Sequence, residues 1–146
     1  NKLSFGVDSM KISTKGRYAL RLLLDIALQG KGAVVSLKEI SGRQGISVKY
    51  LEQIVLKLNK ANCLKSIRGV QGGYMLTKTP AEYRVGDVLR AVEGSLAPIT
   101  CLQSEINNCE HCDQCATLWF WEGMDKAIND YVDQYTLQDF VDHMKS

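Results

Sequence analysis

The feature that most constrains the fold is a pair of short helical segments joined by a tight turn and followed at once by a glycine-rich hairpin. Ser36 can cap the first segment, and Glu39, three residues later, completes a capping box. Gly45 suits the left-handed position that ends a helix, and Ser47 can cap the segment that follows. The apolar face of this second segment is formed by Leu51, Ile54, Val55 and Leu58. Two helices connected in this way are typical of a helix-turn-helix.

The hairpin that follows predicts a winged helix. Residues 64–68 and 74–77 have the composition of two strands, and the glycine-rich turn between them contains Gly69, Gly72 and Gly73. A strand pair directly after a helix-turn-helix, with an arginine at the start of its turn, is the pattern of a wing. We therefore predict a mainly α fold with a small β-hairpin wing.

The rest of the chain is predicted to be helical, apart from one irregular stretch. A first helix should begin near Ser13 or Thr14 and end before Gly30. Apolar spacing then predicts a short helix over 85–93, a long helix over 116–134, and a last short helix opened by Thr136 and Asp139. Residues 95–114 show no sustained apolar period and contain most of the cysteines.

The charge distribution favours a polyanionic partner for one half of the chain. Residues 1–97 hold 16 Lys and Arg against 7 Asp and Glu, a net charge of +9. Residues 98–146 hold 2 against 9, a net charge of −7. Such asymmetry is typical of nucleic-acid binding, although an uneven distribution of solvated charge is the alternative. No stretch approaches the roughly 18 apolar residues of a membrane span, and residues 1–9 do not resemble a signal peptide, so we expect a cytoplasmic protein.

The second helix of the pair carries polar side chains suited to reading DNA. Lys49, Tyr50, Glu52 and Gln53 lie near its N-terminal end. An amide such as Gln53 can pair with adenine through two hydrogen bonds, and a carboxylate such as Glu52 can accept one from cytosine. A merely solvated helix face is the alternative. The position between a capped turn and a wing favours DNA contact.

Two further groups of residues are candidates for contact with the DNA backbone and grooves. Arg68 precedes the three glycines of the turn, which would let the backbone approach DNA closely, or would simply form a tight hairpin. The second group lies at the start of the first helix, where side chains and backbone N–H groups can contact phosphate. Its members are Lys11, Ser13, Thr14, Lys15 and Arg17.

Four of the five cysteines are clustered in a C-x7-C-x2-C-x2-C pattern: Cys101, Cys109, Cys112 and Cys115. In a reducing compartment such a cluster indicates a metal or redox site more often than disulfides. Thiolates are suited to binding iron–sulfur clusters and zinc. The alternatives to a metal site are a metal-free thiol sensor and a C-x-x-C oxidoreductase. The isolated Cys63 follows an apolar helix face and is expected to be a small buried hydrophobe.

Four segments together resemble the iron–sulfur cluster regulator family of winged-helix transcription factors, whose members include IscR, NsrR and CymR. They are MKISTKGRYALRLLLDIA, ISVKYLEQIVLKL, SIRGVQGGYML and VGDVLRAVEG. The resemblance runs from Met10 to about His143 and is closest to the IscR-like branch. Residues 1–9 precede Met10 and are expected to be a tag or a disordered leader. The resemblance implies 10–94 as the DNA-binding domain, 95–115 as a sensor loop, and 116–146 as a dimerisation helix with a short terminal helix. It also implies that Arg68 enters a minor groove, where A·T-rich stretches attract guanidinium groups.

The resemblance further implies a 2Fe–2S cluster in the loop, bound by Cys101, Cys109 and Cys115. The fourth ligand differs within the family. The histidine of IscR falls on Leu118 and the aspartate of NsrR falls on Arg17, and neither residue here can bind iron in that role. The local candidates for the fourth ligand are Cys112 and His111.

The long helix is expected to form a homodimer interface. Its apolar residues are spaced close to a heptad seam, formed by Leu118, Trp121, Ile128, Val132 and Tyr135. The alternative is that the helix packs only on its own domain. We therefore predict a homodimeric regulator, not an enzyme, that binds a palindromic double-stranded operator and responds to its cluster. The alternatives are a cluster-free, CymR-like repressor of sulfur metabolism controlled by a partner protein or thiol oxidation, and a zinc-stabilised DNA-binding protein.

Overall fold

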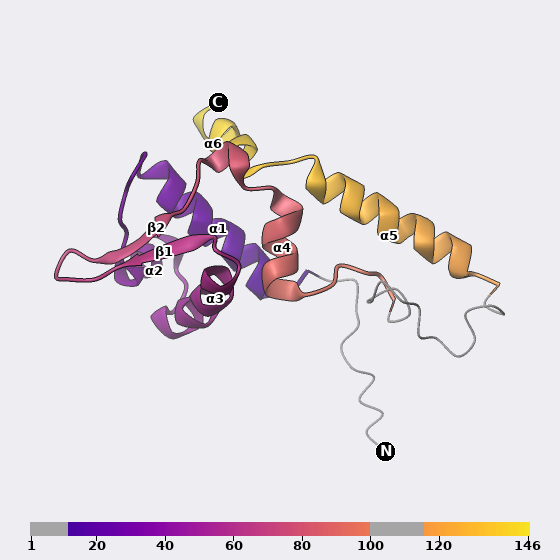
Figure 1. Cartoon of the computed structure of the whole chain (residues 1–146), viewed down its shortest axis with the longest axis horizontal. Helices are drawn as coiled ribbons and strands as arrows, with labels where there is room; N and C mark the ends of the chain where they lie inside the picture. The colour runs from indigo at the N-terminus through magenta and orange to yellow at the C-terminus, as the bar shows by residue number, and fades with distance from the viewer. Residues whose placement is uncertain (1–11, 100–115) are drawn as a thin grey trace, which may run out of the picture.

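The computed structural model describes residues 12–99 and 116–146. In chain order its elements are α1 (Thr14–Leu28), α2 (Leu37–Gln44), α3 (Val48–Lys60), β1 (Leu64–Ile67), β2 (Gly73–Leu76), the short 3-10 helix η1 (Pro80–Glu82), α4 (Val85–Glu93), α5 (Leu118–Asp133) and α6 (Leu137–Lys145). Helices α1 to α4, α6 and the hairpin form one body, and α5 extends away from it (Figure 1). The predicted mainly α, winged-helix architecture is confirmed.

Serine caps fix the starts of the first three helices. The Ser13 hydroxyl accepts a hydrogen bond from the Lys15 N–H, and the Ser47 hydroxyl accepts one from Tyr50 N–H. At Ser36 the capping box is complete, because the Glu39 side chain also accepts from the Ser36 N–H. Each cap satisfies a backbone donor that the helix itself leaves unpaired. The helix starts are therefore determined locally, and the predicted starts of α1, α2 and α3 are confirmed.

The wing is a two-stranded antiparallel hairpin in which Leu64 pairs with Leu76 and Ile67 with Gly73. The first strand begins at the predicted residue but ends one residue early, so Arg68 belongs to the turn, and the second strand lies one residue earlier than predicted. A backbone bridge joins Val35 to Tyr74, with hydrogen bonds of 2.8 and 2.9 Å in the two directions. A Cβ at position 73 would lie 2.5 Å from the Val35 carbonyl oxygen, so this close approach requires glycine.

The core is built around α1, with α2, α3, α4 and α6 packed on it. Its members are apolar and nearly all below 6% exposed: Ala19, Leu22, Leu23, Ile26, Val35, Ile40, Ile46, Leu51, Ile54, Val55, Leu58, Cys63, Leu64, Tyr83, Val88, Val92 and Leu137. The apolar face predicted for α3 is buried in full. Leu137 belongs to α6, so the C-terminal helix completes the core of the N-terminal part of the chain.

Helix α5 packs on the body along one side only and has no buried residue. Ile128 and Val132 contact a small apolar cluster formed by Val85, Leu89 and Leu96. The helix runs from Leu118 to Asp133, shorter than the predicted 116–134. Tyr135, predicted as the last residue of the seam, therefore lies beyond the helix, because its carbonyl instead accepts the Val85 N–H at 2.9 Å.

Candidate nucleic-acid interface

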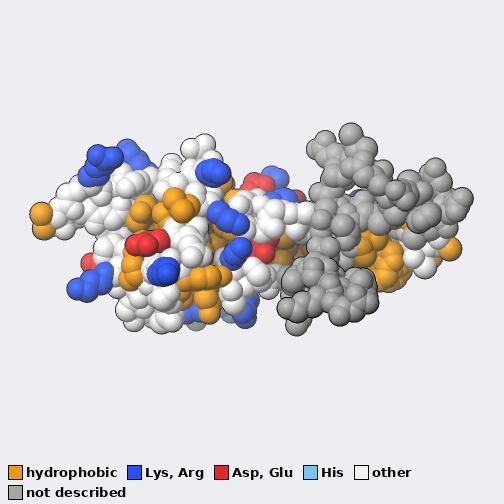
Figure 2. Space-filling model, turned by 90° about the horizontal axis from the view of Figure 1, so that it is seen from below, with side chains coloured by type: hydrophobic (Ala, Val, Ile, Leu, Met, Phe, Trp, Pro, Cys, Tyr) orange, Lys and Arg blue, Asp and Glu red, His pale blue; other side chains and the backbone are white. Residues whose placement is uncertain are grey.

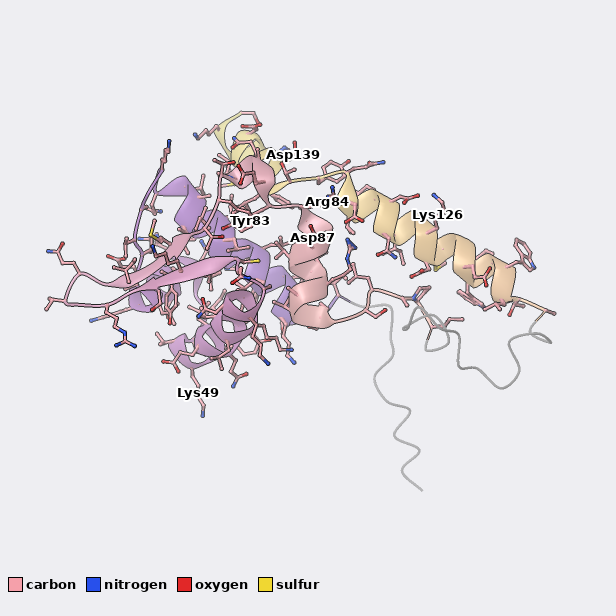
Figure 3. The ribbon with its side chains drawn as sticks, in the orientation of Figure 1. Lys49, Tyr83, Arg84, Asp87, Lys126 and Asp139 are labelled. Atoms are coloured by element: carbon pink, nitrogen blue, oxygen red, sulfur yellow. The ribbon has the colours of Figure 1, made fainter. Side chains whose placement is uncertain are left out.

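Helix α3 presents a polar face that its buried side holds in place. Lys49, Glu52 and Gln53 are exposed, while Leu51 and Leu58 on the other side are fully buried. Figure 3 shows Lys49 projecting from α3 away from the body of the protein. The three side chains that were predicted to read bases are thus brought together on one accessible surface.

Tyr50 is placed differently from its neighbours. It is half-buried, its hydroxyl is 2.8 Å from the Thr14 hydroxyl, and its ring meets the Tyr18 ring edge-on at 5.5 Å. These contacts join the first turn of α3 to the first turn of α1. Tyr50 therefore orients the two elements, and only its exposed edge is available to a ligand.

The first turn of α1 uses most of its hydrogen-bonding groups within the protein. The Lys15 N–H is bonded to the Ser13 hydroxyl, and the Gly16 N–H donates to Glu93 Oε1 at 2.8 Å. What remains for a ligand here is the exposed side chains of Lys15 and Arg17. Lys11, predicted as a member of the same group, lies outside the described residues.

The turn of the wing is tight, and its residues 68–71 are exposed. Gly69 has φ +114°, a left-handed conformation that favours glycine, and its carbonyl accepts the Gly72 N–H at 3.0 Å. A Cβ at position 72 would lie 2.2 Å from the Ile67 carbonyl oxygen, so the hairpin itself explains this glycine. The exposed Arg68 stands at the base of this turn.

Basic side chains dominate the face that carries α3. Figure 2 looks onto this side and shows Lys and Arg spread over it, with few acidic side chains between them. Among the described residues, the side-chain charges of Lys15, Lys49 and Arg68 have no hydrogen-bond or ion-pair partner. Unpaired cations on one surface attract a polyanion and lose little solvation in meeting its phosphates.

Helix α2 is oriented by a buried carboxylate that sequence reasoning did not identify. Asp25, 2% exposed, accepts two hydrogen bonds from Arg43 Nε and one from Arg43 Nη2, at 2.8–3.2 Å, and another from the Gln44 side chain. This hydrogen bonding raises the pKa of Arg43 further above its usual value. Arg21 also donates to the Gln44 carbonyl. In the sequence, Asp25 falls among the apolar residues of the α1 pattern, and this charged exception was the signal that could have indicated a buried carboxylate.

Two apolar side chains also escaped the sequence analysis. Leu56 on α3 is 68% exposed and Val70 at the tip of the wing is fully exposed. Large apolar side chains in water on the two elements that face a ligand are candidates for contact with thymine methyl groups or sugars. Leu56 follows Glu52 by one helical turn, which places it on the same face, and this spacing was readable from the sequence.

The cysteines divide into one described residue and four that are not. Cys63 is buried, as predicted, and burial raises the pKa of its thiol, which leaves it in the unreactive protonated form. Cys101, Cys109, Cys112 and Cys115, together with His111, lie outside the described residues. Within residues 12–99 and 116–146 no group of three or more potential metal ligands occurs.

A helix-turn-helix with an exposed polar face, a wing with an unpaired arginine and a basic surface define a winged-helix DNA-binding protein. The family model described as Rrf2, "Iron-dependent Transcriptional regulator", matches residues 12–143. The chain belongs to the Rrf2 family and is a DNA-binding transcriptional regulator. Its relatives are transcriptional regulators, a class of protein that is generally not enzymatic.

Individual relatives agree with this assignment. The chain is 39% identical over 134 residues to the HTH-type transcriptional regulator IscR of Pectobacterium carotovorum, covering 92% of this chain and 80% of the relative. Among solved structures, CymR, the global cysteine regulator of B. subtilis, is similar with a TM-score of 0.73 and 34% identity, covering 91% and 97%. The IscR of T. potens is similar with a TM-score of 0.73 and 36% identity, covering 92% and 88%. No helix in the described part of the chain is long and apolar enough to cross a membrane.

Proposed function

We propose that the protein is a homodimeric, sequence-specific regulator that reads an operator with α3 and the wing and responds to a 2Fe–2S cluster. The observation that carries the DNA-binding part is the set of exposed, unpartnered cations Lys15, Lys49 and Arg68, which lie on α1, α3 and the turn of the wing, together with the exposed Glu52 and Gln53 of α3. Free cations on these elements attract the phosphates of DNA and release its counterions on binding.

In this proposal the first turns of α3 enter the major groove. Gln53 can hydrogen-bond adenine, and Glu52 can accept from the amino group of cytosine while repelling acceptor edges. Lys49, at the N-terminal end of α3, neutralises phosphate. The wing places Arg68 in the adjacent minor groove, where a narrow A·T-rich segment strengthens the negative potential. Gly69, next to Arg68 in the exposed turn, places no side chain between the backbone of the wing and the DNA.

The DNA part of the proposal is tested with a duplex selected from a random library by the protein itself. We expect Arg68→Ala to weaken binding to that duplex by about 1–3 kcal/mol, with a smaller loss on random duplexes. Glu52→Ala should change which duplexes a repeated selection enriches. Equal losses on selected and random DNA would make Arg68 a phosphate contact, and an unchanged selection would remove Glu52 from the reading set.

The cluster part of the proposal depends on the donor set of the cysteine loop. Thiolates are the ligands that iron–sulfur clusters require, and we assign Cys101, Cys109 and Cys115 to this role. Cys112 or His111 would complete the shell. When bound, the cluster supplies a redox-active, chemically labile centre whose gain or loss would shift the protein between two states of different operator affinity.

Protein purified without oxygen provides the test of the cluster. We expect absorbance beyond 400 nm and about two iron atoms per chain. Replacing Cys101, Cys109 or Cys115 by Ala should abolish that absorbance and leave the far-UV circular dichroism unchanged. Cys112→Ala distinguishes an all-cysteine site, where it has the same effect, from one completed by His111 or another residue. A colourless protein with stoichiometric zinc would replace this proposal by the zinc-stabilised alternative.

The dimer part of the proposal uses α5 and the groove beside it. None of the residues of α5 is buried, and Trp119 and Tyr131 are 72% and 61% exposed. An apolar groove of about 370 Å³ runs between α1, α5 and α6 and is lined by Leu24, Val85, Tyr131, Val132, Tyr135, Asp139, Phe140, His143 and Met144. A two-fold pair would cover both surfaces, and a palindromic operator requires its two α3 helices to lie about 34 Å apart or a multiple of that spacing.

A second candidate function is a cluster-free, CymR-like regulator controlled by a partner protein or by thiol oxidation. The similarity of the fold to CymR of B. subtilis favours it. The group of four clustered cysteines favours the cluster instead. Absence of iron after anaerobic purification, combined with operator binding that changes on oxidation, would select this second candidate.

A further inference from the structure

The last residue of α4 reaches across to the first turn of α1. Glu93 Oε1 accepts one hydrogen bond from the Ser13 hydroxyl at 2.6 Å and another from the Gly16 N–H at 2.8 Å. Both bonds are partly buried, and they span 80 and 77 residues of sequence. Hydrogen bonds to an ionised acceptor are shorter and stronger than neutral ones, so this one oxygen holds the two helix ends together firmly.

The packing at this point is close. Gly16 is buried, and a Cβ at this position would lie 2.8 Å from Glu93 Oε1 and 3.1 Å from Leu89 Cδ2. The backbone of α1 therefore lies close to two side chains of α4, whose ends would have to move if residue 16 carried a side chain of its own. The carboxylate of Glu93 therefore joins the first turn of α1 to the end of α4 and also sets the distance between the two helices there.

The same end of α4 is also joined to α3. The ammonium group of Lys57 on α3 donates to the Val92 carbonyl at 3.1 Å. A small hollow of about 70 Å³ lies where the three helices meet, lined by Lys15, Tyr50, Gln53, Ile54, Lys57 and Val92. The C-terminal turn of α4 is thus the point at which the start of α1 and the DNA-facing helix α3 are held relative to each other (Figure 1).

We propose that Glu93 is a positioning residue for DNA binding. It does not contact DNA. It fixes the position of Ser13 and the nearby Lys15 relative to α3, so that the start of α1 and the exposed face of α3 can contact the same duplex. This inference rests on the proposed interface of α1, α3 and the wing. A carboxylate near phosphates has an unfavourable charge, so its presence here is explained by the geometry that it enforces and not by attraction.

The test compares variants that keep or remove the acceptor. Glu93→Gln keeps an oxygen that can accept from Ser13 and Gly16, and Glu93→Ala removes it. On a duplex selected from a random library by the wild-type protein, we expect Glu93→Ala to bind about tenfold more weakly. Glu93→Gln should bind as tightly as the wild type or more tightly, since a negative charge near phosphate is gone. Glu82→Ala, which removes an exposed carboxylate on η1, is the matched charge control and should bind like the wild type.

A double-mutant cycle separates positioning from loss of folding. The losses of Ser13→Ala and Glu93→Ala should add only in part, because both variants lose the hydrogen bond between Ser13 and Glu93, while Ser13→Ala also loses the cap on the Lys15 N–H and Glu93→Ala also loses the bond from the Gly16 N–H. Ser13→Thr keeps a hydroxyl and should bind more tightly than Ser13→Ala. All affinities are measured below the melting temperature of each variant. The inference is overturned if Glu93→Gln loses as much affinity as Glu93→Ala, if Glu93→Ala binds as tightly as the wild type, or if the two single losses add in full. If Arg68→Ala and the Glu93 variants all leave affinity unchanged, the proposed interface itself is wrong.

Discussion

At the scale of single residues, Tyr83 joins the two ends of the wing to the core. Its ring is 1% exposed, its hydroxyl donates to the Cys63 carbonyl at 2.6 Å, and it accepts the Thr77 N–H at 2.9 Å. Cys63 precedes β1 and Thr77 follows β2, so this one hydroxyl holds the base of the hairpin closed. The direction in which the wing points therefore depends on a side chain outside it.

Tyr83→Phe should destabilise the protein and change its response to alkaline pH. Removing the hydroxyl leaves a backbone donor and acceptor unpaired, so we expect a loss of about 1–3 kcal/mol in the free energy of unfolding. Burial raises the pKa of Tyr83 in the folded state above the value of about 10 expected when unfolded. Its contribution is thus complete below pH 10 and is lost as the pH rises through the folded pKa. Urea unfolding of both proteins at pH 7.5 and 10.5 measures this, and an equal pH dependence in Tyr83→Phe would contradict it.

Which residues could be predicted depends on how far away their partners lie. The caps at Ser13, Ser36 and Ser47 bond to groups two or three residues on, so the sequence alone identified them. Asp25 and Glu93 have partners 18 to 80 residues away. Residues near them in the sequence do not indicate contacts of this range, so neither role of Asp25 and Glu93 was predicted. The same limit explains why Tyr50 was predicted only as a base-reading residue, since its bond to Thr14 crosses between two helices.

At the scale of elements, α4 and α5 are docked by a charged contact packed over a glycine. Arg90 donates to both Asn129 and Asp133, and Gly86 lies beneath the Asp133 carboxylate. A Cβ at position 86 would be 1.9 Å from Asp133 Oδ1 and 2.7 Å from Arg90 Nη2. The place at which α5 leaves the body is thus set by an ion pair and by the absence of a side chain.

Gly86→Ala should loosen α5 from the body. The added methyl group must displace the Asp133 carboxylate and weaken its ion pair with Arg90, at a cost of about 1 kcal/mol because both side chains are partly exposed and can turn aside. We expect faster hydrogen–deuterium exchange in α5 and a lower melting temperature, with exchange in α1 to α3 unchanged. Gly42→Ala is the matched control, because nothing lies within 4 Å of a Cβ there and α2 gains a better helix former. Equal exchange in α5 of Gly86→Ala and the wild type would show that the helices adjust without cost.

Element boundaries were predicted best where the sequence contains a strong local signal. Gly45 has the left-handed φ of +68° expected of a helix end, and α2 stops there. In the wing, the first strand ends one residue before its predicted end and the second begins one residue before its predicted start, because the register depends on the pairing of Ile67 with Gly73 and not on composition. Helix α5 has no side-chain cap at its start, and its predicted start was two residues early.

At the scale of the whole molecule, the opposite charges of the two parts of the chain match their tasks. The basic part presents α3 and the wing to one side, and the acidic part contributes α5, which extends away from that face (Figure 1). An acidic helix close to the duplex would repel it, so this separation favours DNA binding. The two halves could be assigned from the sequence, whereas the side of α5 that a second copy would cover could not.

The structure also shows which substitutions test the proposed dimer cleanly. Ile128 and Val132 belong to the seam predicted from the sequence, but both side chains pack on the cluster of Val85, Leu89 and Leu96 in the same subunit, so Ile128→Asp or Val132→Asp would not be a clean test. A charge there would disturb the fold of one chain as well as any association. Tyr131 is a better site, because it is 61% exposed in the single chain and lines the apolar groove.

Tyr131→Asp should therefore give a folded monomer with weak operator binding. A charge at an exposed position costs a single chain little, about 0.5 kcal/mol or less, whereas burying it between two copies of the chain is strongly unfavourable. Sedimentation at micromolar concentration should show a dimer for the wild type and a monomer for the variant, with an unchanged melting profile in dilute solution. The control is Lys126→Gln, an exposed position about 140° around the helix from Tyr131, shown in Figure 3, which should still dimerise. Because one α3 contacts only half of a palindrome, the monomer should bind a single half-site and the full duplex with similar affinity. A Tyr131→Asp variant that keeps the dimer and full operator affinity would exclude this face of α5 from the interface.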